Sequence, residues 1–151
     1  MSYLKKASEI AIELSDRLSQ IKTENQFGSE IGSTVLRGRR RIDDHQIPCV
    51  VLIEGPDNPI QAQARIAQSA ITQTYILVSY DKCHPNHPND KAHVLIRDLK
   101  RAIFHDGTTL GDKVRKVTYV GRDIGPRGDG VDIVCATVEI TVEYVEDFAD
   151  A

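Results

Sequence analysis

The run GVDIVCATVEITVEYVED, from Gly130 to Asp147, alternates apolar and polar residues over almost its whole length. One face collects Val134, Ala136, Val138, Ile140, Val142 and Tyr144, and the other collects Cys135, Thr137, Glu139, Thr141 and Glu143. Strict period-two alternation with β-branched residues predicts a strand with one buried face. At a rise of about 3.3 Å per residue the run can reach on the order of 50 Å, against a usual strand of about 5–6 residues. We therefore expect the strand either to bend or to project, at about residues 140–146, toward a neighbouring chain.

The rest of the chain predicts alternating helices and strands. Apolar residues at three- and four-residue steps predict amphipathic helices over residues 2–23 and 91–105, the second capped by Asn89 or Asp90. Strands are predicted over residues 34–42, 47–54, 64–81 and 114–124, and loops over residues 24–33, 55–59 and 82–90. This order predicts a single domain over residues 1–151 of the α/β (α+β) class. We expect a mixed, mostly antiparallel sheet with two main helices on one face and long projecting strands.

Composition narrows the classes of function. The 151 residues carry 19 basic and 22 acidic side chains, a net charge of −3, so nucleic acid is not expected as the main partner. No apolar run approaches the roughly 20 residues that span a bilayer, and the first 20 residues carry acidic side chains unlike a signal peptide. Three scattered cysteines favour a reducing, intracellular compartment.

Few residues suggest chemistry. Cys83, His84 and His87 are of types that bind zinc, but a structural site needs four ligands and no second pair follows, so a surface turn is the favoured interpretation. The tripeptide at 127–129, Arg-Gly-Asp, is likewise interpreted as a turn between Pro126 and Gly130. Phosphate-binding loops, nucleophile elbows and zinc-protease motifs are absent from the sequence. We expect no catalytic residue, no metal, no cofactor and no enzymatic activity.

Two strips of charge stand out. Arg37, Arg39 and Arg41 share one face of the predicted strand 34–42, which is either the exposed face of an edge strand or a contact for an acidic surface. The opposite charge is on the last strand, whose candidate interface residues are Glu139, Glu143, Tyr144 and Glu146. The two strips either meet between subunits or pair within one subunit.

The layout resembles the tail terminator proteins of long-tailed phages, the lambda-type minor tail group. The resemblance rests on the first helix ending in Leu18–Ile21 and on five further segments. These are IPCVVLIE at 47–54, the long strand at 64–80, DKAHVLIRDLKRAI at 90–103, VTYVGRDI at 117–124 and VEITVEYVED at 138–147. It covers nearly the whole chain and includes no catalytic motif.

The resemblance implies a non-enzymatic virion protein with an α/β fold. It implies a hexameric homo-oligomer, a ring that stops polymerisation of the tail tube and offers a joining surface to the head connector or neck protein. It also implies assembly in the host cytoplasm, a place at the head-proximal end of the tail, no membrane, and only incidental nucleic-acid contact in the ring lumen. The alternatives are a neck or head-completion protein and, from a different class, a small intracellular α/β ligand-binding or hydrolytic domain.

Overall fold

Five strands form one sheet in the order β1-β2-β3-β5-β4. The computed structural model describes residues 6–38, 41–59, 68–125 and 131–147. The strands are β1 (Val35–Arg37), β2 (Cys49–Pro59), β3 (Gln68–Lys82), β4 (Lys116–Ile124) and β5 (Ile133–Asp147). β1 runs parallel to β2, and every other neighbouring pair is antiparallel. The predicted mixed, mostly antiparallel sheet is therefore confirmed.

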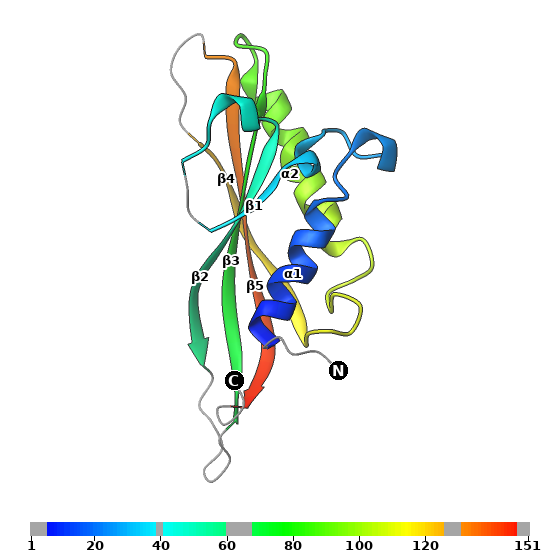
Figure 1. The fold of residues 1–151 in the computed structure, drawn as a ribbon, viewed down its shortest axis with the longest axis vertical. Helices are drawn as coiled ribbons and strands as arrows, with labels where there is room; N and C mark the ends of the chain where they lie inside the picture. Colours follow the sequence, from blue (N-terminus) through cyan, green and yellow to red (C-terminus); the bar gives the residue numbers. More distant parts are fainter. Residues whose placement is uncertain (1–5, 39–40, 60–67, 126–130, 148–151) are drawn as a thin grey trace.

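Two α-helices, α1 (Lys6–Leu18) and α2 (Pro88–Phe104), lie on the same face of the sheet (Figure 1). Three short 3₁₀ helices occupy the connections: η1 (Thr23–Asn25), η2 (Ile31–Ser33) and η3 (Asp44–Gln46). The helix α2 begins earlier than predicted, with His87 as its N-cap. Pro88 is suited to the first helical position because its φ is already helical and the N–H it lacks has no partner there.

The buried face of β5 runs from Val134 to Tyr144, as its alternation predicts. Its even-numbered residues from Val134 to Tyr144 are at most 2% exposed and belong to one core cluster with Ile10 of α1 and Ile71 of β3. The expectation that residues 140–146 project is therefore wrong for this face, because side chains of the same subunit already cover it. Only the tip of β5 extends beyond the first turn of α1 (Figure 1), and Val145, on the other face, is 42% exposed.

Two strand boundaries differ from the predictions. β2 continues through the expected loop at 55–59, because a bulge between Glu54 and Asp57 absorbs the Gly-Pro pair and pairing with β3 resumes at Asp57. β1 is much shorter than predicted and ends at Arg37, because Gly38 takes a positive φ of 86°. Arg41 therefore lies outside the strand.

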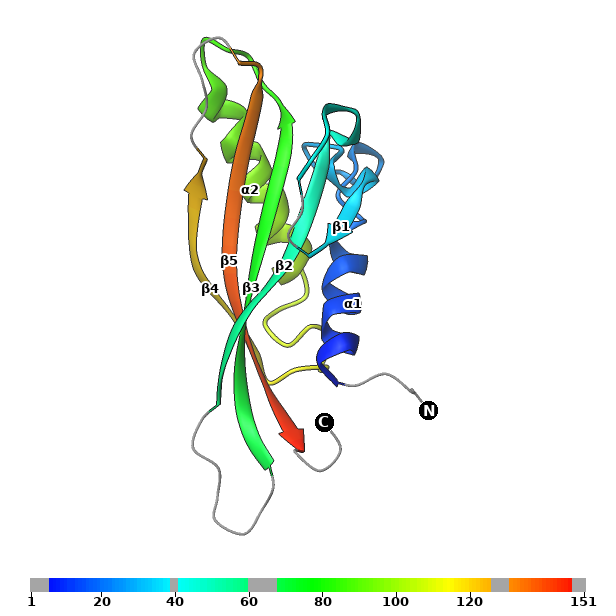
Figure 2. The ribbon, with the colours of Figure 1, turned by 60° about the vertical axis from the view of Figure 1, so that its left-hand side comes forward.

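Neither α-helix lies in front of the opposite face of the sheet (Figure 2), although Cys49 and Val51 of β2 are at most 3% exposed on that face. A second bulge, between Tyr119 and Gly121 of β4, lies at the same level as the bulge of β2. Both flank the row in which Tyr75 of β3 pairs with Ile140 of β5. Bulges increase local twist, so this row is where the sheet bends.

Candidate interaction surface

The uncovered face of the sheet has an apolar centre and a polar side. Its side chains are Ile76, Val78 and Tyr80 on β3 and Thr137, Glu139, Thr141 and Glu143 on β5. The β2 residues on the same face, Cys49, Val51 and Ile53, are already buried within the chain. The β3 and β5 members are half-buried by their neighbours in the sheet. A half-buried apolar patch bordered by threonine and glutamate is typical of a surface that a partner covers.

A hollow lies on this face where β4 bulges. It is lined by Ile76, Val120, Gly121, Arg122, Asp123, Thr137 and Glu139. A Cβ placed on Gly121 meets no atom within 4 Å, and Val120 is 51% exposed. No hydrogen bond or ion pair to Glu139 is found in the described part of the chain. The hollow therefore combines an apolar wall with a carboxylate for which no ion pair is found in the described part of the chain.

The other β5 candidates already have partners within the subunit. The Oε1 atom of Glu143 lies 3.5 Å from Nη1 of Arg115. Tyr144 is 2% exposed, and its hydroxyl donates to Oε2 of Glu146 at 3.3 Å. Burial, together with the nearby Glu146 carboxylate, raises the pKa of Tyr144 to about 12. Tyr144 is thus a core residue, and Glu139 is the β5 carboxylate best placed for a neighbour.

The basic strip lies at the far edge of the sheet. Arg37 is exposed, with its Nη2 4.0 Å from Oε2 of Glu54, and Arg41 is exposed beyond the end of β1. Arg39 lies outside the described residues. Two strands, β2 and β3, separate β1 from β5. The strand order therefore keeps Arg37 apart from the β5 carboxylates within one chain.

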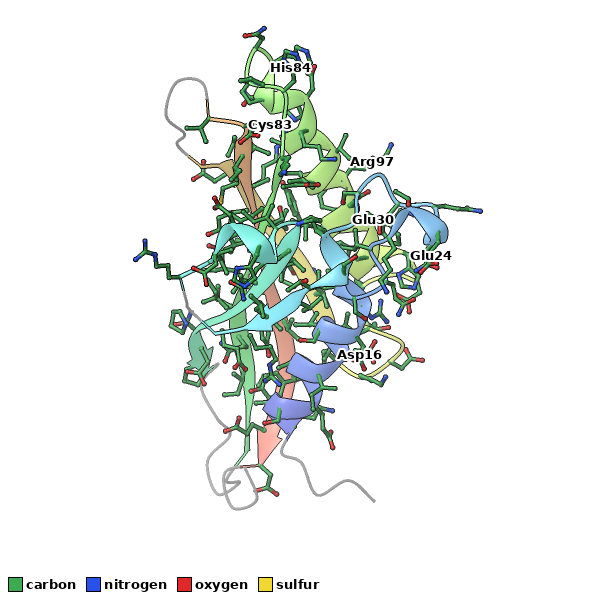
Figure 3. All side chains as sticks on the ribbon, turned by 45° about the horizontal axis from the view of Figure 1, so that its top comes forward. Asp16, Glu24, Glu30, Cys83, His84 and Arg97 are labelled. Atoms are coloured by element: carbon green, nitrogen blue, oxygen red, sulfur yellow. The ribbon has the colours of Figure 1, made fainter. Side chains whose placement is uncertain are left out.

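The Cys-His loop forms a compact turn ahead of α2 (Figure 3). The rings of His84 and His87 stack with centroids 4.2 Å apart, and Nδ1 of His87 lies 3.3 Å from Oδ2 of Asp90. The backbone N–H of Asn86 donates to Nδ1 of His84. Across the described ranges, no three His, Cys, Asp or Glu side chains gather as a metal site would require. The Arg-Gly-Asp tripeptide at 127–129 lies outside those ranges.

The cysteines show no activation. Cys49 of β2 and Cys135 of β5 flank Tyr80 of β3 on the uncovered face, and both are free thiols. Burial raises the pKa of Cys49 to about 11 and also raises that of Cys135, so both stay protonated at neutral pH. Neither thiol therefore has the character of a nucleophile.

The sequence did not reveal the hollow, although it carried a signal. Gly121 interrupts an otherwise β-branched run, and an isolated glycine inside a strand pattern often marks a bulge. Comparison with protein-family models and with curated proteins finds no match to this chain. Neither described helix is long and apolar enough to cross a membrane. The surface chemistry is therefore the basis for assigning a function.

Proposed function

We propose that this protein is a structural assembly protein of a long-tailed phage or a phage-derived particle. It forms a homo-oligomeric ring, a hexamer by its family resemblance, at the end of the tail tube. The ring stops tube polymerisation and gives the head connector its joining surface. Its partners are further copies of itself, the tail-tube protein and the connector or neck protein, and any nucleic acid touches only the lumen.

The observation that carries the proposal is the sheet with helices on one face only. The apolar residues Ile76 and Val78 lie on the other face and are only half-buried. A closed ring needs two different patches on each copy, because each interface joins one patch to the other. Arg37 lies on β1 at one edge of this sheet, and Asp123 and Glu139 lie with Arg122 around a hollow near the other edge.

The test combines mass measurement with electron microscopy. Light scattering or native mass spectrometry gives the copy number of the purified full chain, alone and after mixing with tubes of a phage tail-tube protein. Negative-stain images should show one ring at one end of each tube, and tubes grown with the protein present should stop elongating. Tubes that elongate equally with and without the chain would overturn the proposal.

The same images separate the alternatives. A neck or head-completion protein should bind the portal-side connector and leave tube ends bare. A hydrolytic or ligand-binding domain should remain a monomer in the presence of tubes and act on a small molecule. A monomer in solution alone is compatible with the proposal, because assembly proteins can oligomerise only on their target.

A further inference from the structure

The hollow at the β4 bulge has the shape and chemistry to receive one long cationic side chain. Ile76 and Val120 offer an apolar wall for a methylene stem, and Gly121 leaves space where any other residue would place a Cβ. Glu139 supplies a carboxylate without a described partner, and Asp123 supplies a second at the rim. Arg122 also lines the rim, so the net charge of the hollow is that of one carboxylate.

The strand register places this hollow level with the basic end of β1. Arg37 pairs with Leu52, Leu52 with Leu77, Leu77 with Val138, and Val138 with Arg122, so one row crosses the whole sheet. The two features therefore lie at opposite edges of the sheet and at the same level along the strands. When two copies lie edge to edge with their strands at the same level, the hollow of one copy meets the basic end of β1 of the other copy.

The connection that follows β1 carries an exposed arginine, Arg41. Gly38 is the residue after the strand, and its N–H donates to the Leu52 carbonyl at 2.9 Å. Its positive φ of 86° turns the chain away from strand geometry. Arg41 follows and is exposed, whereas Arg37 lies 4.0 Å from Glu54. Arg41 is thus the described arginine best placed to reach a neighbour.

We propose that the hollow of one copy receives Arg41 from the β1 end of the next copy. This inference rests on the ring proposed above and identifies its lateral contact. Each copy offers one hollow and one Arg41, which are two different patches, so the contact is heterologous and repeats around the ring. Such a contact closes into a ring where the rotation between neighbouring copies closes.

Charge exchange tests the contact. Glu139→Lys and Arg41→Glu should each weaken ring formation by about tenfold or more, because each puts like charges in one contact. The combination of both substitutions should recover assembly, since the opposite charges face each other again. Arg41→Lys keeps the charge and Glu24→Lys changes an exposed carboxylate on η1, so both should assemble as the wild type does. Mass is measured by light scattering in solution and rings are counted on tubes.

Two further variants test the same contact without reversing charge. Gly121→Val fills the hollow in open space, so it should leave the unfolding midpoint unchanged while weakening assembly. In Arg41→Lys, a zero-length carbodiimide reagent should link position 41 to Glu139. Mixed heavy- and light-isotope chains should show that the link joins two copies and not two positions of one chain.

The outcomes separate this contact from the proposed function. Rings that persist in Glu139→Lys and Arg41→Glu, or losses that the combined variant does not restore, would overturn the contact and leave the ring proposal standing. A carbodiimide link from position 41 to another carboxylate would also overturn it. A wild-type chain that forms no ring, alone or on tubes, would overturn the proposed function and the contact with it.

Discussion

At the scale of single residues, buried charges fix the loops onto the helices. Asp98 of α2 is completely buried and accepts hydrogen bonds from the backbone N–H of Gly28 at 3.0 Å and from the Ser29 hydroxyl at 2.6 Å. These bonds satisfy a carboxylate that is costly to bury. They also attach the segment between η1 and η2 to a helix about seventy residues away. The sequence shows Asp98 only as one polar residue in a helical pattern, so its role depends on tertiary contacts.

Replacing Asp98 with alanine should lower the free energy of unfolding by about 2 kcal/mol. The substitution leaves the buried Ser29 hydroxyl without an acceptor and also removes the acceptor of the Gly28 N–H. Urea denaturation followed by circular dichroism measures the change. Asp90→Ala, in the exposed first turn of the same helix, is the matched control and should change stability by about 0.5 kcal/mol or less. Equal effects of the two variants would contradict this role of Asp98.

Asp106 should make stability depend on pH. Its two carboxylate oxygens accept from Nη1 and Nη2 of Arg17 at 2.7 and 2.9 Å, and these bonds lower its pKa from 3.8 to about 2. A lowered folded-state pKa gives stability that is present above the unfolded value and is lost as pH falls. The contribution should therefore be complete at pH 7 and disappear between about pH 4 and pH 2.

Comparison of the wild type with Asp106→Asn across that range tests this dependence. The variant should have the lower urea midpoint at pH 7, and the two midpoints should converge as the pH approaches 2. The Asp106 side chain is 37% exposed, so solvent screening keeps the difference small. A difference that stays constant from pH 7 to pH 2 would show that the Arg17 contact does not carry the effect.

At the scale of elements, the sequence predicted the core residues correctly where one face of a strand is buried. The alternation in β5 predicted the core residues from Val134 to Tyr144, because each of them faces the helices. The Gly-Pro pair at 55–56 predicted a loop, yet a bulge accommodates it within β2. Turn residues indicate local backbone conformation, and only the partner strand decides whether pairing resumes after the bulge. The length of β1 was overestimated for a related reason, because Gly38 ends it.

Two glycines with contrasting surroundings give an element-scale prediction. A Cβ on Gly32 of η2 would lie 2.6 Å from the Leu18 carbonyl oxygen and 2.7 Å from the Ile21 nitrogen, both backbone atoms at the end of α1. Gly32→Ala should therefore lower the free energy of unfolding by at least about 2 kcal/mol, because η2 and α1 must separate. Gly121→Ala meets open space and should leave stability unchanged or raise it by up to about 1 kcal/mol.

Thermal and urea denaturation of the two variants measure the contrast. Both substitutions add one methyl group, so the difference between them reports the surroundings alone. A Gly32→Ala protein as stable as Gly121→Ala would mean that η2 does not pack tightly on the end of α1.

At the scale of the whole molecule, the candidate surface could not be predicted in full. Glu139 and Arg41 were recognised as members of charged strips, but the hollow depends on which strands are neighbours and in which register. The level row from Arg37 to Arg122 crosses four strand pairings, and none of them is visible in local periodicity. Tyr144 is buried within the subunit, and this burial also depends on tertiary structure.

The proposed contact gives assembly a particular dependence on salt. Each copy has a net charge of −3, so copies repel one another in general, while Arg41 and Glu139 attract in particular. The variant that combines Glu139→Gln with Arg41→Gln removes one negative and one positive charge and therefore keeps the net charge. Screening of the general repulsion is then the same in both proteins, and any difference in salt dependence belongs to the pair.

The two proteins should therefore differ most in dilute salt. The Debye length falls from about 10 Å at 0.1 M to about 3 Å at 1 M, so attraction at a solvent-accessible rim weakens over this range. Sedimentation analysis at several salt concentrations gives the association constant of each protein. Wild-type association should exceed that of the neutral variant at about 0.1 M, and the difference should narrow toward about 1 M. Parallel salt curves would mean that the two side chains do not meet in the ring, because an ion pair open to solvent cannot escape screening.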